Sequence, residues 1–139
     1  MAATWQIRKA LDNDRNVVVK LWEEAGFGST NADEWGAITS AGGPVELLVA
    51  EEDGRVIGTA VSSFDGWRAF VYHVVVAPAH QRQGVARALM SEAESLIKRH
   101  GARRAFALVN SEHTAGLALC AAAGFIPEGD MAFVKEFSK

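Results

Sequence analysis

The sequence predicts an α/β (α+β) fold in which a mixed central β-sheet is flanked by helices on both faces. Two observations lead to this fold class. Segments with strand-like and helix-like apolar spacing alternate along the 139-residue chain, and a near-continuous apolar run at residues 70–76 is followed by an amphipathic segment at 84–100. The order of these segments predicts about 6–7 strands and about four helices. We expect them to form a single domain spanning residues 1–139.

The first third of the chain predicts one strand and two helices. Residues 5–10 alternate between apolar and polar and predict the first strand. Apolar residues between Val17 and Trp22 then recur at helical spacing, with Asp12 or Asn13 as the expected N-cap. Residues 31–40 predict a second short helix, which ends before a glycine-rich turn.

The middle of the chain predicts a hairpin followed by a buried strand and a long helix. Asp53-Gly54 separates two β-branched runs, residues 45–51 and 55–64, and this dipeptide is a strong hairpin signal. The run at 70–76 suits a central strand that is buried on both faces. Residues 84–100 carry apolar side chains three and four positions apart, and Gly101 is suited to cap the C-terminus of that helix.

The last third predicts a strand at 104–109, a helix at 113–123 and two closing strands, one at Phe125 and one at 131–137. The predicted helix contains no charged residue, so we expect it to be buried in the core or against a partner. Together with aromatic residues that are expected to be exposed, this helix predicts a possible homodimer.

The composition excludes several classes of protein. A hydrophobic content of 49% is enough for one sizeable core, and a net charge of −3 provides no basic field for nucleic acid. Cys120 is the only cysteine, so neither an intramolecular disulfide nor a cysteine cluster for zinc can form, and we expect no metal. No run of about 18 apolar residues is present, and the first eight residues do not resemble a signal peptide. We therefore expect a cytoplasmic protein without a membrane partner.

The junction between the buried strand and the long helix has the features of a phosphate-binding loop. The first turn of a helix has unpaired N–H groups, and Gly84 would let a phosphate approach the backbone closely. Residues 66–91 contain no Asp or Glu but do contain Arg68, Arg82 and Arg87. These features favour a phosphate-bearing ligand. The alternative is an ordinary strand–loop–helix connection with exposed arginines.

The motif at this junction resembles that of a known family. Val76-x-Pro78 followed by Gln81-x-x-Gly84-x-Ala86 is similar to the Gln/Arg-x-x-Gly-x-Gly/Ala motif of the GNAT superfamily of N-acetyltransferases. The Asp-Gly hairpin, Gly101 and the Gly124-Phe125 pair also match the family pattern, so the resemblance covers nearly the whole chain. It implies a GNAT fold in which the strands ending at Val76 and Val109 splay apart to hold acetyl-CoA.

The resemblance also implies an activity, a cosubstrate and its binding residues. The activity is N-acetyl transfer from acetyl-CoA to a primary amine of a small molecule or a peptide N-terminus, by direct attack of the amine on the acetyl carbon. Backbone around Val74 and Val76 would pair with the pantetheine arm, and Asn110 would lie nearby. Backbone N–H groups of the loop would wrap the pyrophosphate: Gln81, Arg82, Gln83, Gly84, Val85, Ala86 and Arg87.

The catalytic residues depart from the family pattern at two positions. Cys120 lies four residues before Gly124, where many members carry a Tyr that acts as general acid, and His113 replaces the usual Asn. Cys120, Tyr72 and His113 are therefore the catalytic candidates. A catalytically weak domain that binds or senses acyl-CoA remains the alternative.

The acceptor side is predicted from strand alternation and from aromatic residues. Alternation places Tyr72 on the same strand face as Val74 and Val76, and His73 on the opposite face as a packed residue. Aromatic residues that would wall the acceptor pocket are Trp22, Phe27, Trp35 and Trp67.

Overall fold

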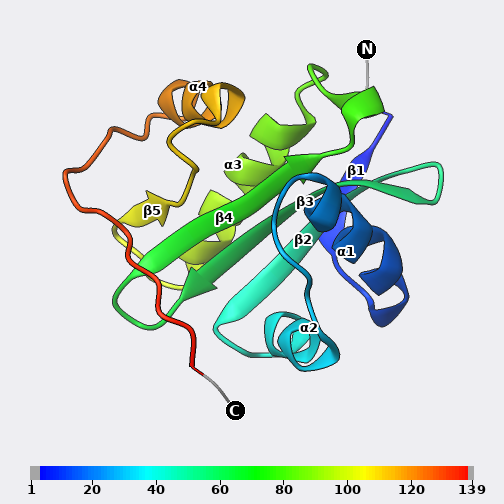
Figure 1. The fold of residues 1–139 in the computed structure, drawn as a ribbon, viewed down its shortest axis with the longest axis horizontal. Coiled ribbons are helices and arrows are strands. Elements are labelled where there is room, and N and C mark those ends of the chain that lie inside the picture. Colours follow the sequence, from blue (N-terminus) through cyan, green and yellow to red (C-terminus); the bar gives the residue numbers. More distant parts are fainter. Residues whose placement is uncertain (1–3, 138–139) are drawn as a thin grey trace.

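The computed structural model describes residues 4–137 and confirms the predicted mixed α+β architecture (Figure 1). A five-stranded sheet has the order β1-β2-β3-β4-β5; the first three pairs are antiparallel and β4–β5 is parallel. The elements in chain order are β1 Gln6–Lys9, the 3-10 turn η1 Asp12–Asp14, α1 Arg15–Glu24, α2 Ala32–Thr39, β2 Val45–Glu52, β3 Arg55–Phe64, β4 Ala69–Val76, the 3-10 turn η2 Pro78–His80, α3 Val85–Arg99, β5 Ala105–Ala107 and α4 Thr114–Ala122.

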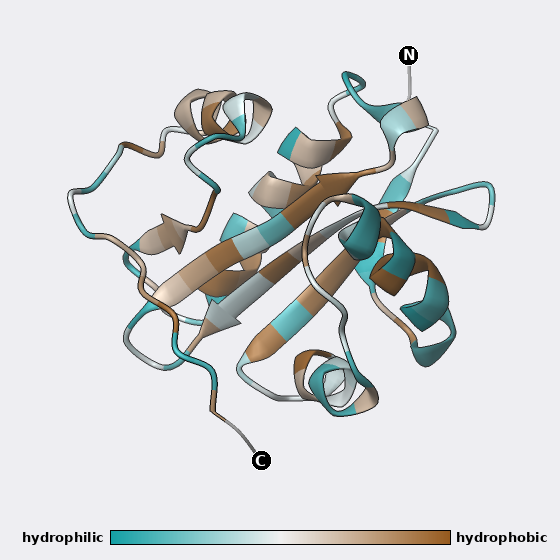
Figure 2. Cartoon of the chain, viewed as in Figure 1, coloured by the Kyte–Doolittle hydropathy of each residue, from teal (hydrophilic) through white to brown (hydrophobic). Residues whose placement is uncertain are grey.

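Each face of the sheet packs against its own pair of helices. Strand alternation sends Leu47 and Val49 of β2 into a cluster with α1 and α2, while Leu48 and Ala50 join a cluster with α3. One side of α4 adds Leu119 to the second cluster. Figure 2 shows hydrophobic colour along the strands and hydrophilic colour on the outward side of α1. None of the helices in the described part of the chain is long and apolar enough to cross a bilayer.

Local sequence signals account for most element boundaries. Asn31 caps α2: its side chain accepts a hydrogen bond from the Glu34 N–H at 2.8 Å, and the Glu34 carboxylate accepts one from the Asn31 N–H at 3.3 Å. Asp53 and Gly54 both have positive φ, as a tight hairpin turn requires. The α1 start differs from the expected N-cap at Asp12 or Asn13. Those residues form η1, and α1 begins at Arg15.

The two closing strands predicted at Phe125 and 131–137 are absent among the described residues, so the sheet has five strands rather than six or seven. The segment after α4 runs to the end of the described chain without helix or strand (Figure 1). Its local pattern is strand-like, but β5 is only three residues long and offers few backbone partners. Its apolar side chains are therefore exposed: Ile126, Met131, Phe133, Val134 and Phe137.

Candidate active site

The sheet opens between β4 and β5. The two strands pair only from Ala69–Ala105 to Val71–Ala107, with one further hydrogen bond from the Leu108 N–H to the Val71 carbonyl at 3.2 Å. Beyond this point β4 continues to Val76 without β5 beside it. The predicted splaying of the two strands is therefore confirmed, although the second strand, expected at 104–109, ends at Ala107 and not at Val109.

A cavity of about 560 Å³ occupies this opening. It is lined from both faces of the sheet, because Val74 and Met90 belong to the α3 side whereas Tyr72 and Phe27 belong to the α1 side. The cavity thus connects the two faces, so that two substrates could meet inside the sheet. Seven of the sequence-predicted site residues line it: Tyr72, Val74, Val76, Gln81, Asn110, His113 and Cys120.

The other six predicted cofactor residues do not line this cavity and continue the chain from it into α3. Gly84 is the N-cap of α3 with φ +85°, and an added Cβ there would meet no atom within 4 Å. No side chain caps this helix and its first turn contains no acidic residue. Free N–H groups beside open space, in a first turn without acidic side chains, fit the pyrophosphate of acetyl-CoA. Gln81 braces the loop by donating its side-chain amide to the Val76 carbonyl at 3.1 Å.

Three residues of the acid-free stretch that was expected to favour a phosphate have other contacts or positions. The Arg87 guanidinium donates to the Ala122 carbonyl at 3.1 Å and so links α3 to the C-terminus of α4. Val85 is 1% exposed and packs in the core, so only its backbone can face a ligand. Arg68 lies at the opposite end of β4, with its guanidinium 4.5 Å from the Trp67 ring centroid, so this arginine does not contribute to the loop.

A bulge in β4 corrects the predicted side-chain directions. Thr59 pairs with Val75 and Val61 with Tyr72, so His73 and Val74 lie opposite the single residue Ala60 of β3. Tyr72 therefore packs with the α1–α2 cluster, whereas Val74 and Val76 pack on the α3 side. The prediction that Tyr72 shares a face with those valines is wrong, because regular alternation cannot anticipate an inserted residue.

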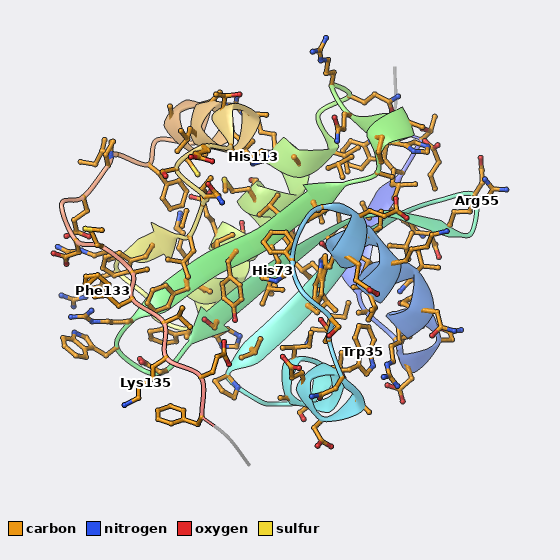
Figure 3. All side chains as sticks on the ribbon, in the orientation of Figure 1. Trp35, Arg55, His73, His113, Phe133 and Lys135 are labelled. Carbon is orange, nitrogen blue, oxygen red and sulfur yellow. The ribbon has the colours of Figure 1, made fainter. Side chains whose placement is uncertain are left out.

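The three catalytic candidates lie on different walls of the cavity. Cys120 is half-buried in α4, and burial raises the pKa of its thiol. Tyr72 is half-buried in β4, and burial likewise raises the pKa of its hydroxyl. His113 precedes α4 on the side that faces the sheet (Figure 3). Its Nδ1 would lie 2.5 Å from a Cβ at position 116, so Gly116 makes room for the imidazole.

The aromatic residues predicted to wall the acceptor pocket divide into three environments. Phe27 lines the cavity from the loop after α1. Trp22 and Trp35 are buried in the α1–α2 core, and Trp67 is 77% exposed between β3 and β4. Sequence reasoning missed His73 as a cavity residue, since alternation placed it on the face away from Tyr72.

Comparison with known proteins agrees with this geometry. Residues 5–125 match the model of the acetyltransferase (GNAT) family. The chain belongs to the GNAT family. It is 36% identical over 117 residues to the L-amino acid N-acyltransferase MnaT of Escherichia coli, covering 80% of this chain and 67% of that protein. It is 28% identical to an acetyltransferase of Photorhabdus laumondii, covering 83% and 82% of the two chains. This GNAT protein is therefore an acyltransferase.

Solved structures share the GNAT fold at low sequence identity. The aminoglycoside acetyltransferase AAC(6')-Iy, in complex with a bisubstrate analogue of CoA, superimposes with a TM-score of 0.79 at 19% identity, over 98% of this chain and 100% of that one. A predicted acetyltransferase from Clostridium acetobutylicum with acetyl-CoA gives a TM-score of 0.76 at 13% identity, over 94% and 96% of the chains. These similarities support the fold of this chain.

Proposed function

We propose that this GNAT enzyme transfers an acetyl group from acetyl-CoA to a primary amine of a small molecule or a peptide N-terminus. The observation that carries the proposal is the cavity through the β4–β5 opening, which leads from Gln81 at the phosphate loop to the catalytic candidates. When bound, acetyl-CoA would supply the acetyl group as a thioester. The L-amino acid specificity of the MnaT relative is consistent with an amine acceptor.

Different residues of the chain bind the cosubstrate and assist the transfer. The free N–H groups of the first turn of α3 hold the pyrophosphate, and Val74 and Val76 offer backbone groups where β5 no longer pairs with β4. Asn110 shapes the opposite side: its side-chain oxygen accepts a hydrogen bond from the Glu112 N–H at 2.8 Å. Cys120 holds a proton for the departing thiolate, because burial keeps its thiol protonated at neutral pH.

Purified protein incubated with acetyl-CoA and a panel of primary amines should release free thiol in proportion to acetylated amine. The panel should include L-amino acids, peptides with free N-termini and aminoglycosides, with thiol release in the absence of amine as the control. A protein that binds acetyl-CoA by calorimetry but releases no thiol with any amine would favour the acyl-CoA sensor alternative. Replacement of the family Tyr by Cys120 is the observation that favours that alternative.

The enzyme is also expected to form a homodimer. The uncharged helix α4 leaves Leu117 44% exposed, and Phe133 and Val134 in the segment after it are each 86% exposed. Among the described residues β5 ends the sheet and pairs with β4 alone. This edge and the exposed apolar side chains suit a second copy of the chain. Light scattering at tens of micromolar should report a dimer, and Phe133→Lys should shift it toward monomer. A wild-type protein that stays monomeric across the series would reject this expectation.

A further inference from the structure

His73 occupies a strained position in the middle of β4. Its φ is +49°, in the left-handed region that a bulky L residue rarely adopts. The strain coincides with the bulge, where His73 and Val74 lie opposite Ala60. Such a conformation persists only where the surrounding structure maintains it, and residues strained in this way cluster at active sites.

A buried hydrogen-bond network holds this strained backbone in place. The Trp22 indole N–H donates to the Thr59 hydroxyl at 2.8 Å, and that hydroxyl donates to the His73 carbonyl at 2.9 Å. Thr59 is fully buried, so its hydroxyl would be costly to leave without partners. The network therefore fixes the position of His73 relative to the core.

Aromatic contacts orient the His73 imidazole while leaving its nitrogens accessible. The ring stacks on Phe27 with centroids 3.9 Å apart and meets the edge of Trp22 at 4.9 Å. Among residues 4–137, no group forms a hydrogen bond with a ring nitrogen of His73. The buried side-chain atoms that lack a partner do not include these two nitrogens, so both reach the surface of the cavity or solvent. The residue lines the cavity shared with His113 and Cys120, and Figure 3 shows it midway along β4 beside the loop after α1. An imidazole so placed can accept a proton from a molecule in the cavity.

We propose that His73 is the general base that deprotonates the acceptor amine, a role that rests on the proposed acetyl transfer. The acceptor ammonium gives one proton to a ring nitrogen of His73, which later releases it to solvent. The amine lone pair then forms the C–N bond as the C–S bond breaks. The second amine proton is lost as the amide forms, and the thiolate takes up one proton. Desolvation lowers the pKa of His73, so its imidazole is neutral and able to accept a proton at neutral pH.

The test compares His73→Asn and His73→Gly with wild type in the thiol-release assay at several pH values. Asn and Gly both tolerate positive φ, so each removes the base without adding backbone strain. We expect kcat/KM to fall by about 10²–10⁴. We also expect loss of the acid limb of the wild-type pH profile, and partial rescue of His73→Gly by added imidazole. His100→Asn, at the exposed C-terminus of α3, is the matched control and should behave as wild type.

The outcomes distinguish failure of the base assignment from failure of the proposed acetyl transfer. Acetyl-CoA binding and thermal unfolding, measured for every variant, separate loss of the base from loss of the fold. A folded His73→Asn enzyme with turnover within a few-fold of wild type and the same acid limb would overturn the base assignment alone. Absence of thiol release by wild type would overturn both this assignment and the proposed function. An acid limb that came from another carboxyl or imidazole group lining the cavity would persist in His73→Asn: Glu24, Glu112 and His113. Tyr72 and Cys120, whose pKa values are raised by burial, lose their protons only in alkaline solution and so give no acid limb.

Discussion

Substitution of Gly84 by Glu is expected to weaken acetyl-CoA binding by at least about 100-fold, or about 2.7 kcal/mol, while the protein stays folded. Gly84 precedes the first turn of α3, where free N–H groups and the helix dipole favour an anion. A carboxylate at this position would occupy the space of the pyrophosphate and repel it. A non-glycine residue at φ +85° adds backbone strain of about 1–2 kcal/mol. The fold should survive this, because an added Cβ meets no atom within 4 Å and an acidic side chain suits a helix N-terminus.

The opposite end of the same helix provides the control. Gly101 also has a positive φ, +105°, and open space around an added Cβ. Gly101→Glu thus introduces the same charge and similar backbone strain away from the loop, and calorimetry should give wild-type affinity. Gly84→Asn, which tolerates positive φ, should lose less affinity than Gly84→Glu. Wild-type affinity in a folded Gly84→Glu protein would contradict the position assigned to the cosubstrate.

Local signals predicted the elements whose stability is decided nearby in the sequence. Asn31 and Glu34 form a capping box that starts α2, and the Asp53-Gly54 turn sets the β2–β3 hairpin. The segment at 131–137 has an equally good strand pattern but forms no strand, because a strand also needs a neighbouring edge to pair with. Periodicity reports which side chains could share a face and gives no information on whether a partner strand is available.

The candidate site was predictable where it depends on a contiguous motif and was not where it depends on a bulge. The motif from Gln81 to Ala86 follows a buried strand directly, so chain connectivity alone places it at the start of α3. The direction of Tyr72 and the exposure of His73 to the cavity depend on one extra residue in β4. That residue is stabilised by Thr59, 14 positions away, and by Trp22 in α1. Such a long-range arrangement leaves no periodic signal in the sequence.

The second large effect is expected at Cys120. If its thiol protonates the departing thiolate, Cys120→Ala should lower turnover at saturating acetyl-CoA by about 10²–10⁴. Proton transfer between two thiols of ordinary pKa is nearly isoenergetic, and burial makes the Cys120 thiol a weaker acid than an ordinary one. A tyrosine, with an ordinary pKa of about 10, would have the longer reach. The Cys120 thiol is shorter, so a water molecule can relay the proton. Because burial raises its pKa, the thiol stays protonated at neutral pH, and its ionisation should give the pH profile an alkaline limb.

A packing role for Cys120 predicts a different result. The residue is only half-buried, so loss of its sulfur should change the free energy of unfolding by no more than about 1 kcal/mol. Turnover and thermal unfolding should therefore be measured for Cys120→Ala and Cys120→Ser, with Ala121→Ser on the exposed side of α4 as the control. An acid role requires both Cys120 variants to lose turnover and the alkaline limb of the pH profile, while the control keeps both. If Cys120→Ala retains turnover within a few-fold of wild type, the proton must come from Tyr72, His113 or bound water.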